Sequence, residues 1–257
     1  MSQFLVFCLH GPLCAWGGVA VGELRMSQAH PTRSAVLGLV AGSLGLRREQ
    51  EDDLLALDAS LGLALRVLSP GRPLTDFHTI EMPSTKKRGG ERHATRRAEL
   101  IAAKAQNDNP MLSFREYRVD SLHLACLWET RPEPPWPLEE IAHALERPVF
   151  SPYLGRKSCP PALPFAPRLV EAGDARQALA ADRSATLEAA VLARLPRPGG
   201  PGDFFWDADD GGAGAGLAGS ADDVFSRRDR ILSRRRWQFS PRREARARWS
   251  EPAPQEE

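Results

Sequence analysis

Residues 3–10 read QFLVFCLH, an apolar run of β-prone residues that ends at the turn signal Gly11-Pro12. A run of this length, bounded in this way, predicts a buried strand. The Gly-rich and polar stretch 11–31 is interpreted as a loop. Residues 31–34 then read PTRS and begin a predicted helix, because Thr32 or Ser34 can cap it and an apolar face follows. Its glycines line one side, which suggests close packing against a sheet.

Further elements follow in a mixed order. We expect helices at 51–57 and 137–145, and strands at 61–68, 74–82, 114–119 and 122–128. The last two strands are predicted to pair across Asp120-Ser121. Residues 83–110 are polar and basic without an apolar period, and we interpret them as a long excursion from the core. The order strand, helix, strands, helix, strand fits an α+β, ferredoxin-like (RRM-like) domain over residues 1–167.

The last third of the chain has a different composition. Residues 168–257 are rich in Ala, Gly, Pro and Arg, and predict a small, mainly-β second domain. Short strands are expected at 231–239 and 245–249. The stretch 199–223 is rich in Gly and Asp, so we expect a flexible loop there.

Composition narrows the class of protein. The chain has 257 residues, of which 42% are hydrophobic, an ordinary globular value. No apolar run reaches the roughly 18 residues of a membrane helix, and we see no signal peptide. We therefore expect a cytoplasmic protein without membrane contact. The four cysteines lack zinc-ligand spacing, so we expect reduced thiols, no metal and no cofactor.

The net charge of +1 conceals strong segregation. Residues 86–97 carry six Lys and Arg against Glu91, and residues 227–248 carry ten arginines against two acids. Between these basic stretches, residues 203–223 hold six aspartates and no basic residue. Local patches set the local field, so the neutral total is compatible with a polyanionic partner. Solvated charged faces are the plainer alternative.

Several strings in the first two-thirds of the chain resemble a known family. They are GPLCAWG (11–17), PTRSAVLGL (31–39), DFHT (76–79), FREY (114–117) followed by VDSL (119–122), and SPYLGRKSCP (151–160). In this order and at these separations they resemble the CasD family of type I-E CRISPR Cascade, of the Cas five class and the RAMP superfamily. The resemblance covers about residues 1–167 and fades over 168–257.

This resemblance implies a fold and a role. It implies a ferredoxin-like domain with a projecting basic β-hairpin thumb at about 83–113, and a small C-terminal domain. It implies a non-catalytic subunit that holds the 5′ handle of a CRISPR RNA (crRNA) and caps the backbone filament. The implied partners are crRNA and the CasA, CasB, CasC and CasE subunits, with target DNA met indirectly. A different subunit cuts the crRNA precursor.

Two of the quoted strings suggest RNA contacts near the first helix. A helix N-terminus offers unpaired N–H groups to a phosphate. Arg33 would add a bidentate charge there and Ser34 a hydroxyl. The alternative is a plain helix cap with a solvated arginine. Trp16 either stacks on a base of the handle or plugs the edge of the sheet as core.

Other candidate contacts lie in the thumb and in the 151–160 loop. The loop combines an aromatic, a Gly bend, two cations and a hydroxyl, which suits a clamp on one or two nucleotides or a structural loop. His78 is interpreted as a hydrogen-bond donor to RNA, a core residue or a general base. The C-terminal arginines at 234–236 and 242–248 could contact RNA, DNA or an acidic neighbour, or could only aid solubility, and the sequence leaves this choice open. The candidate RNA-binding residues are Trp16, Arg33, Ser34, His78, Lys86, Lys87, Arg88, Arg96, Arg97, Tyr153, Arg156, Lys157 and Ser158.

Two other functions compete. A related subunit of type I-C Cascade cuts the precursor with a Tyr-Lys-His set, so a metal-independent endoribonuclease is the alternative. Such cleavage needs a base, an acid and a cation, yet this chain has only Tyr117 and Tyr153, neither near the first helix. A generic RRM-like RNA binder is less favoured because the usual Gly-Phe-Gly-Phe-Val signature is absent.

Overall fold

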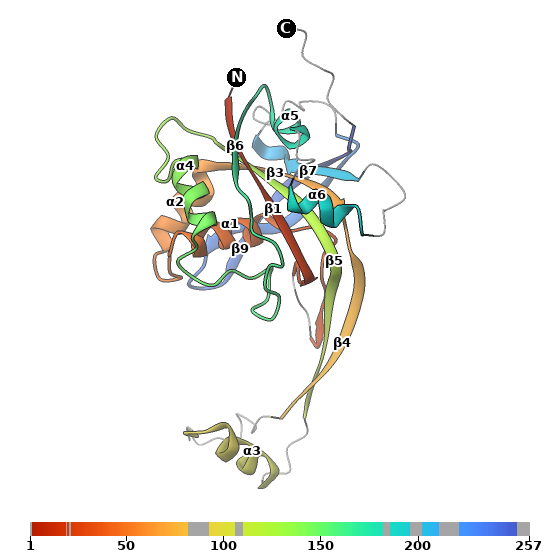
Figure 1. Ribbon diagram of the computed structural model, residues 1–257. Coiled ribbons are helices and arrows are strands. Elements are labelled where there is room, and N and C mark those ends of the chain that lie inside the picture. The colour runs from red at the N-terminus through yellow and green to blue at the C-terminus, as the bar shows by residue number, and fades with distance from the viewer. Residues whose placement is uncertain are drawn as a thin grey trace.

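The computed structural model describes residues 2–18, 20, 22–81, 93–105, 110–181, 186–195, 202–210 and 221–250. Within these residues it shows one mixed α/β architecture built on a large, mainly antiparallel sheet (Figure 1). The strands are β1 (Ser2–Cys14), β2 (Leu24–Arg25), β3 (Leu61–Ser69), β4 (Arg72–Ile80), β5 (Met111–Glu129), β6 (Arg168–Ala172), β7 (Asp203–Asp207), β8 (Asp223–Ser233) and β9 (Gln238–Arg248). The helices are α1 (Arg33–Ser43), α2 (Glu51–Ser60), α3 (Arg96–Ala105), α4 (Leu138–Glu146), α5 (Ala175–Ala180), α6 (Leu187–Leu192) and the short 3₁₀ helix η1 (Ala208–Asp210).

The central strands are buried on both faces. The sheet runs in the order β6-β1-β5-β3-β7-β9-β8. Leu5, Phe7 and Leu9 of β1 pack in one apolar cluster with α1, α2 and α4, whereas Phe4 and Val6 pack in a second cluster on the other face with α5 and β7. A strand covered on both sides reads as a continuous apolar run, which is why residues 3–10 predicted β1 correctly.

The structure extends β1 beyond the predicted turn. Gly11 pairs with Ser121 of β5 and Leu13 pairs with Val119, so the strand continues to Cys14. Pro12, which has no N–H to donate, is skipped in this register. Gly11-Pro12 therefore does not end the strand, and the loop expected from residue 11 begins after Cys14.

The two strands predicted at 114–119 and 122–128 are one strand. β5 runs through Asp120-Ser121 over 19 residues, and Asp120 takes a positive φ of 59° that bends the chain without reversing it. β3 pairs with the second half of β5, and β4 pairs with the first half. The turn therefore lies between β3 and β4, where Gly71 has a φ of +69°.

A long ribbon leaves the body of the protein. It consists of β4 paired with residues 111–119 of β5, and we call it the ribbon. The short strand β2 pairs with the other edge of β5 at Phe114 and Arg115. Figure 1 shows the ribbon projecting away from the body that contains α1, α2 and α4, with α3 at its far end. Helix α3 was not predicted from the sequence. Residues 83–92 and 106–109, which belong to the expected excursion, lie outside the described residues.

The C-terminal third continues the same sheet. β6 joins the edge beside β1, and β7, β9 and β8 extend the opposite side beyond β3. Residues 203–207 form β7, so the loop predicted at 199–223 is wrong at that point. The strand predicted at 231–239 is also wrong, because β8 ends at Ser233 and β9 begins at Gln238 with a turn between them.

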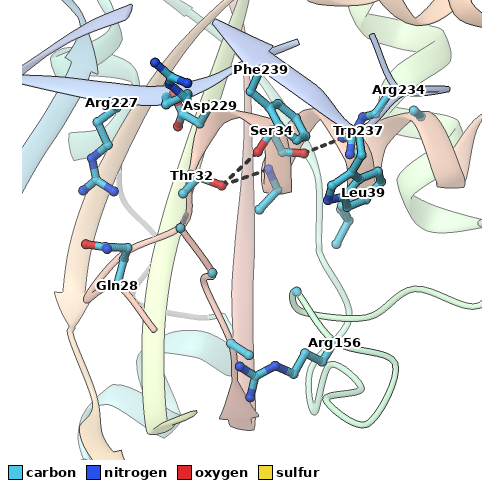
Figure 2. A pocket seen from close by; sticks show the side chains of 18 of the residues that line it. Gln28, Thr32, Ser34, Leu39, Arg156, Arg227, Asp229, Arg234, Trp237 and Phe239 are labelled. Carbon is cyan, nitrogen blue, oxygen red and sulfur yellow. Dashed lines mark hydrogen bonds between the residues drawn. The ribbon is translucent and has the colours of Figure 1, made fainter. Parts of the chain in front are cut away.

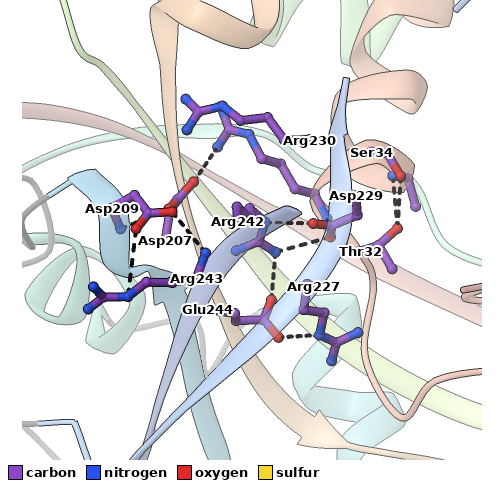
Figure 3. A network of polar contacts seen from close by, with 12 residues as sticks. Thr32, Ser34, Asp207, Asp209, Arg227, Asp229, Arg230, Arg242, Arg243 and Glu244 are labelled. Carbon is purple, nitrogen blue, oxygen red and sulfur yellow. Dashed lines mark hydrogen bonds and ion pairs between the residues drawn. The ribbon is translucent and has the colours of Figure 1, made fainter. Parts of the chain in front are cut away.

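A buried polar network joins α1 and α2 to the β8–β9 hairpin (Figure 3). Arg33, 1% exposed, donates from Nε to Asp58 Oδ1 at 3.0 Å, and its backbone N–H donates to Asp229 Oδ2 at 2.8 Å. Asp229 also accepts two bonds from Arg242, at 2.7 and 3.1 Å, and Arg242 reaches Glu244 Oε1 at 2.7 Å. The opposite charges compensate one another in a site from which water is excluded.

The pKa values of this network follow from its geometry. Burial alone would raise the pKa of Glu244, but its hydrogen bond to His30 and the charges of His30, Arg242 and Arg227 lower it to about 2. The charge of Asp229, the hydrogen bonds that Arg242 donates to it, and the carboxylate of Glu244 raise the pKa of Arg242 against the effect of burial. The carboxylate and the guanidinium are therefore both charged at neutral pH.

All four cysteines are buried with free thiols. Among the described helices, none is both long and apolar enough to cross a membrane.

Replacing Arg33 tests how far the fold depends on the network. We expect Arg33→Met to lower the free energy of unfolding by about 3–5 kcal/mol, because it leaves buried carboxylates without their cation. Urea unfolding followed by circular dichroism measures this loss. Arg235→Met is the matched control: Arg235 is exposed in the β8–β9 turn, so this change should leave unfolding within about 0.5 kcal/mol of the parent. Equal stabilities would show that the network is not needed.

Candidate nucleic-acid interface

A wide groove of about 1620 Å³ lies between four segments far apart in the sequence. Its walls are the stretch after β1, the first turns of α1, the loop around residues 150–156, and the β8–β9 hairpin (Figure 2). We call it the groove. The polar network holds one wall to another, since Asp229 on β8 bonds the first residue of α1.

The start of α1 does not offer the phosphate site expected from the sequence. Thr32 caps the helix, its side chain accepting from the Ala35 N–H, and the Asp229 carboxylate takes the Arg33 N–H. The Arg33 guanidinium points inward and also donates to the backbone carbonyls of Asp58 and Leu61. The expectation that Arg33 contacts RNA is not met in this geometry, because internal acceptors already occupy both its charge and its N–H.

Ser34 lines the groove. Its hydroxyl lies 3.2 Å from Thr32 Oγ1, and its carbonyl accepts from Arg234 at 2.9 Å. A Cβ on Gly38, one turn later, would lie 2.7 Å from Arg234 Nη2. Gly38 therefore makes room for the hairpin arginine, whereas the sequence suggested packing against a sheet.

Trp16 belongs to the core. Its side chain is 2% exposed and meets His123 edge-on, with ring centroids 6.0 Å apart. Its backbone N–H donates to Ser27 Oγ, and its carbonyl accepts from the Gln28 N–H. Of the two interpretations of this residue, the structure favours the plug at the sheet over the stacking platform.

The 151–160 loop is fixed against the end of β1. The Ala15 N–H donates to the Leu154 carbonyl at 3.0 Å, and Gly155 adopts a φ of +86°. A Cβ at Gly155 would lie 1.8 Å from the Ala15 carbonyl oxygen, so only glycine fits. This anchoring presents Tyr153, 43% exposed, and Arg156 to the groove.

The other loop residues differ in position. Arg156 donates to the carbonyls of Glu116 and Arg25, each at 3.0 Å, and its guanidinium lies 4.7 Å from the centre of the Tyr117 ring. Lys157 and Ser158 are exposed but do not line the groove. The expected clamp thus divides between two residues in the groove and two beside it.

The remaining candidates lie on the ribbon. His78 Nε2 is 2.5 Å from Asp76 Oδ2, two residues away on the same face of β4. Arg96 pairs with Glu99 at 2.8 Å within α3, and Arg97 is exposed on the same helix. Lys86, Lys87 and Arg88 lie outside the described residues. The structure therefore divides the candidates between the groove and the ribbon.

Sequence reasoning gave no role to most of the cations in the groove. Arginines 25, 47, 48, 227, 228, 234 and 246 line it together with Arg156, and Trp237 and Phe239 add aromatic rings. The arginine density of 227–248 was visible in the sequence. Its place opposite α1 was not, because it depends on pairing across nearly 200 residues.

Several of these arginines are hydrogen-bonded to uncharged carbonyl groups and not to carboxylates. Arg48, Arg156 and Arg234 donate to backbone carbonyls, which hold a guanidinium in place without neutralising it. By contrast, Arg246 pairs with Asp203 at 3.0 Å, and Arg227 pairs with Glu244 at 2.6 Å. Burial lowers the pKa of Arg234 because it disfavours the charged form. A bound anion would stabilise that charged form.

This arrangement of guanidinium groups and aromatic rings suits a ligand that carries both phosphates and planar bases. Fixed guanidinium groups bind phosphates, and exposed aromatic rings accept stacked bases. Among the described residues, no cluster of three or more His, Cys, Asp or Glu side chains could hold a metal ion.

Known proteins resemble this chain. Residues 4–245 match the family described as CRISPR-associated protein (Cas_Cas5). The CRISPR system Cascade subunit CasD of Escherichia coli (strain K12) is 32% identical over 187 residues, covering 70% of this chain and 76% of the relative. A chain of a solved CRISPR RNA-guided surveillance complex superposes with a TM-score of 0.63 and 25% identity, over 98% of this chain and 92% of that one. A solved Cas protein, 23% identical over 98% of this chain and 100% of that one, shares the fold with a TM-score of 0.56.

The buried imidazole beneath Trp16 predicts a pH dependence. Burial lowers the pKa of His123 to about 3, against an ordinary value of 6.5. Between these values the unfolded chain binds a proton that the folded chain does not, so unfolding becomes easier as the pH falls. This group alone contributes about 1.4 kcal/mol per pH unit.

We therefore expect His123→Leu to reduce the loss of stability between pH 6.5 and 5, measured by urea unfolding. His143→Leu, which changes an exposed histidine on α4, is the control and should keep the acid sensitivity of the parent. An unchanged slope in His123→Leu would contradict the assignment.

Proposed function

This chain belongs to the CasD family of CRISPR-associated (Cas_Cas5) proteins, and from that premise we propose that it is a non-catalytic Cascade subunit that binds crRNA and holds its 5′ handle. The observation that carries the proposal is the groove. Its fixed, uncompensated arginines face exposed aromatic rings. Single-stranded RNA is recognised by such pairs of charge and stacking surface.

The ribbon is the second part of the proposal. We propose that it corresponds to the family's thumb, with α3 at its tip, and that Arg96, Arg97 and the basic stretch 86–92 meet the RNA or the neighbouring backbone subunit. The ring centroids of its exposed Phe77 and Phe114 lie 5.2 Å apart, and both rings leave apolar area that a partner could cover. The strand order β6-β1-β5-β3, with α1 and α4 in the connections, supports a ferredoxin-like core.

Partners follow from the same premise. The E. coli relative is named a Cascade subunit, and a similar chain comes from an RNA-guided surveillance complex. We propose assembly with CasC backbone subunits, whose filament this protein would cap, and with CasA, CasB and CasE. Base pairing by the guide would supply target specificity, while the protein holds the guide by charge and shape.

Cleavage is not needed for this role. His78 pairs with Asp76 on the ribbon, whereas Tyr117 is buried and Tyr153 belongs to the groove. We propose that processing of the precursor falls to another subunit. The test mixes the purified protein with labelled precursor RNA and with processed crRNA, and a gel scores binding and cutting together.

Binding to processed crRNA without cleavage, lost when the handle is scrambled, would support the proposal. Site-specific cutting of the precursor would overturn the non-catalytic role. Equal binding to scrambled RNA would overturn handle recognition.

A charge deletion in the groove tests where the RNA lies. Arg228 is exposed on β8 and lines the groove. We expect Arg228→Ala to weaken crRNA binding about five- to tenfold and to reduce the slope of log affinity against log salt by about one phosphate contact. Fluorescence anisotropy over a salt series measures both quantities. Arg147→Ala, an exposed arginine after α4 and outside the groove, should match the parent; equal losses in both variants would indicate non-specific attraction.

A further inference from the structure

The turn between β8 and β9 carries an unusual tryptophan. The last paired residues are Ser233 and Gln238, and the four residues between them, 234–237, read RRRW. We call this the RRRW turn. Trp237 adopts a φ of 57°, a left-handed conformation that glycine or asparagine adopts at lower cost. The fold alone would be served as well by a smaller residue.

The Trp237 side chain is open to solvent. Its side chain is 61% exposed, whereas Trp16, Trp128, Trp206 and Trp249 are each at most 6% exposed. Trp249 shows what a closed site looks like, since Arg66 lies only 3.8 Å from its ring centre. The guanidinium groups of Arg48 and Arg234 also lie over the Trp237 ring, but farther away, at 5.2 and 5.4 Å from its centre. A large apolar ring is thus held at the surface with area left uncovered.

Fixed cations surround this ring. Arg48 donates to the carbonyls of Arg234 and Arg235, at 2.7 and 2.8 Å, and so holds the RRRW turn against the segment after α1. Arg234 donates to the Ser34 carbonyl, and Gly38 leaves it the space to do so. The ring of Phe239 meets that of Trp237 edge-on at 5.8 Å. Figure 2 shows Arg234, Trp237 and Phe239 together at one end of the groove, away from Arg156.

We propose that Trp237 is a stacking platform for one nucleobase of single-stranded RNA, with the guanidinium groups of Arg48 and Arg234 placed for the phosphates beside that base. The inference rests on the proposed function and adds a subsite from the C-terminal hairpin. An exposed indole between guanidinium groups suits a base attached to a charged backbone, because stacking and phosphate contact occur together. The charge around the ring favours RNA over an apolar protein segment.

The first test combines a protein change with an RNA change. A set of handle-containing crRNAs is made, each lacking one base at a single abasic position. For the parent protein, we expect one abasic position to weaken binding roughly 5- to 100-fold, the usual effect of losing a stacked base. Trp237→Gly should bind the intact RNA as weakly as the parent binds that abasic RNA. Removing the same base should not weaken binding to Trp237→Gly any further. Trp237→Phe should recover most of the affinity.

A second measurement separates this role from a structural one. Because glycine suits the left-handed conformation, the urea midpoint of unfolding of Trp237→Gly should equal or exceed that of the parent. If the Trp237 ring had a structural role, the substitution would lower this midpoint. Arg235→Gly changes an exposed neighbour in the same turn and is the control, which should keep the sensitivity to the abasic position.

The outcomes are distinguishable. If the parent protein does not bind the handle, the proposed function fails. If the handle binds normally to Trp237→Gly, and no abasic position depends on residue 237, the platform is overturned while the proposed function stands. If Trp237→Gly keeps RNA binding but loses assembly with another Cascade subunit, the ring is a protein contact and the inference is also overturned.

Discussion

The carboxylate of Asp229 is the point on which the groove depends. It accepts the first N–H of α1 and two bonds from Arg242, and all three residues are nearly excluded from water. A helix N-terminus attracts an anion, and here the anion comes from the hairpin that forms the opposite wall. The Asp229 carboxylate therefore occupies the position at the N-terminus of α1 where an external anion would otherwise bind. The same contact holds two walls of the groove together.

This internal neutralisation explains how a chain with a net charge of +1 can offer a cationic surface. The buried acids Asp58, Asp229 and Glu244 compensate Arg33, Arg242 and Arg227 inside the protein. Three other arginines at the groove, Arg48, Arg156 and Arg234, are held instead by carbonyl oxygens, which orient a guanidinium without cancelling its charge. Counting charges along the sequence cannot separate these two sets, because the difference lies in which acceptor each guanidinium reaches.

Local patterning predicted the elements whose causes are local. The apolar run of β1, the start of α1 with Thr32 as one of two candidate caps, and the amphipathic α4 were all visible in short windows. β5 was not, because Asp120-Ser121 resembles a turn and only long-range pairing with β1 keeps the strand continuous. Arg33 was misread for a similar reason, since its partners Asp58 and Asp229 lie 25 and 196 residues away. The resemblance to the CasD family identified the family, which local patterning could not.

The two halves of the groove also carry different constraints. The 151–160 loop is fixed by backbone contacts, and Gly155 admits no other residue beside Ala15. The β8–β9 hairpin is fixed at its base by buried ion pairs, so its turn can change without loss of those contacts. A bulky residue in a left-handed conformation at such a turn costs stability that the hairpin does not recover from packing, because the ring is mostly exposed. The residue at the tip is thus free to be set by what binds in the groove, while the residues at the base are set by the fold.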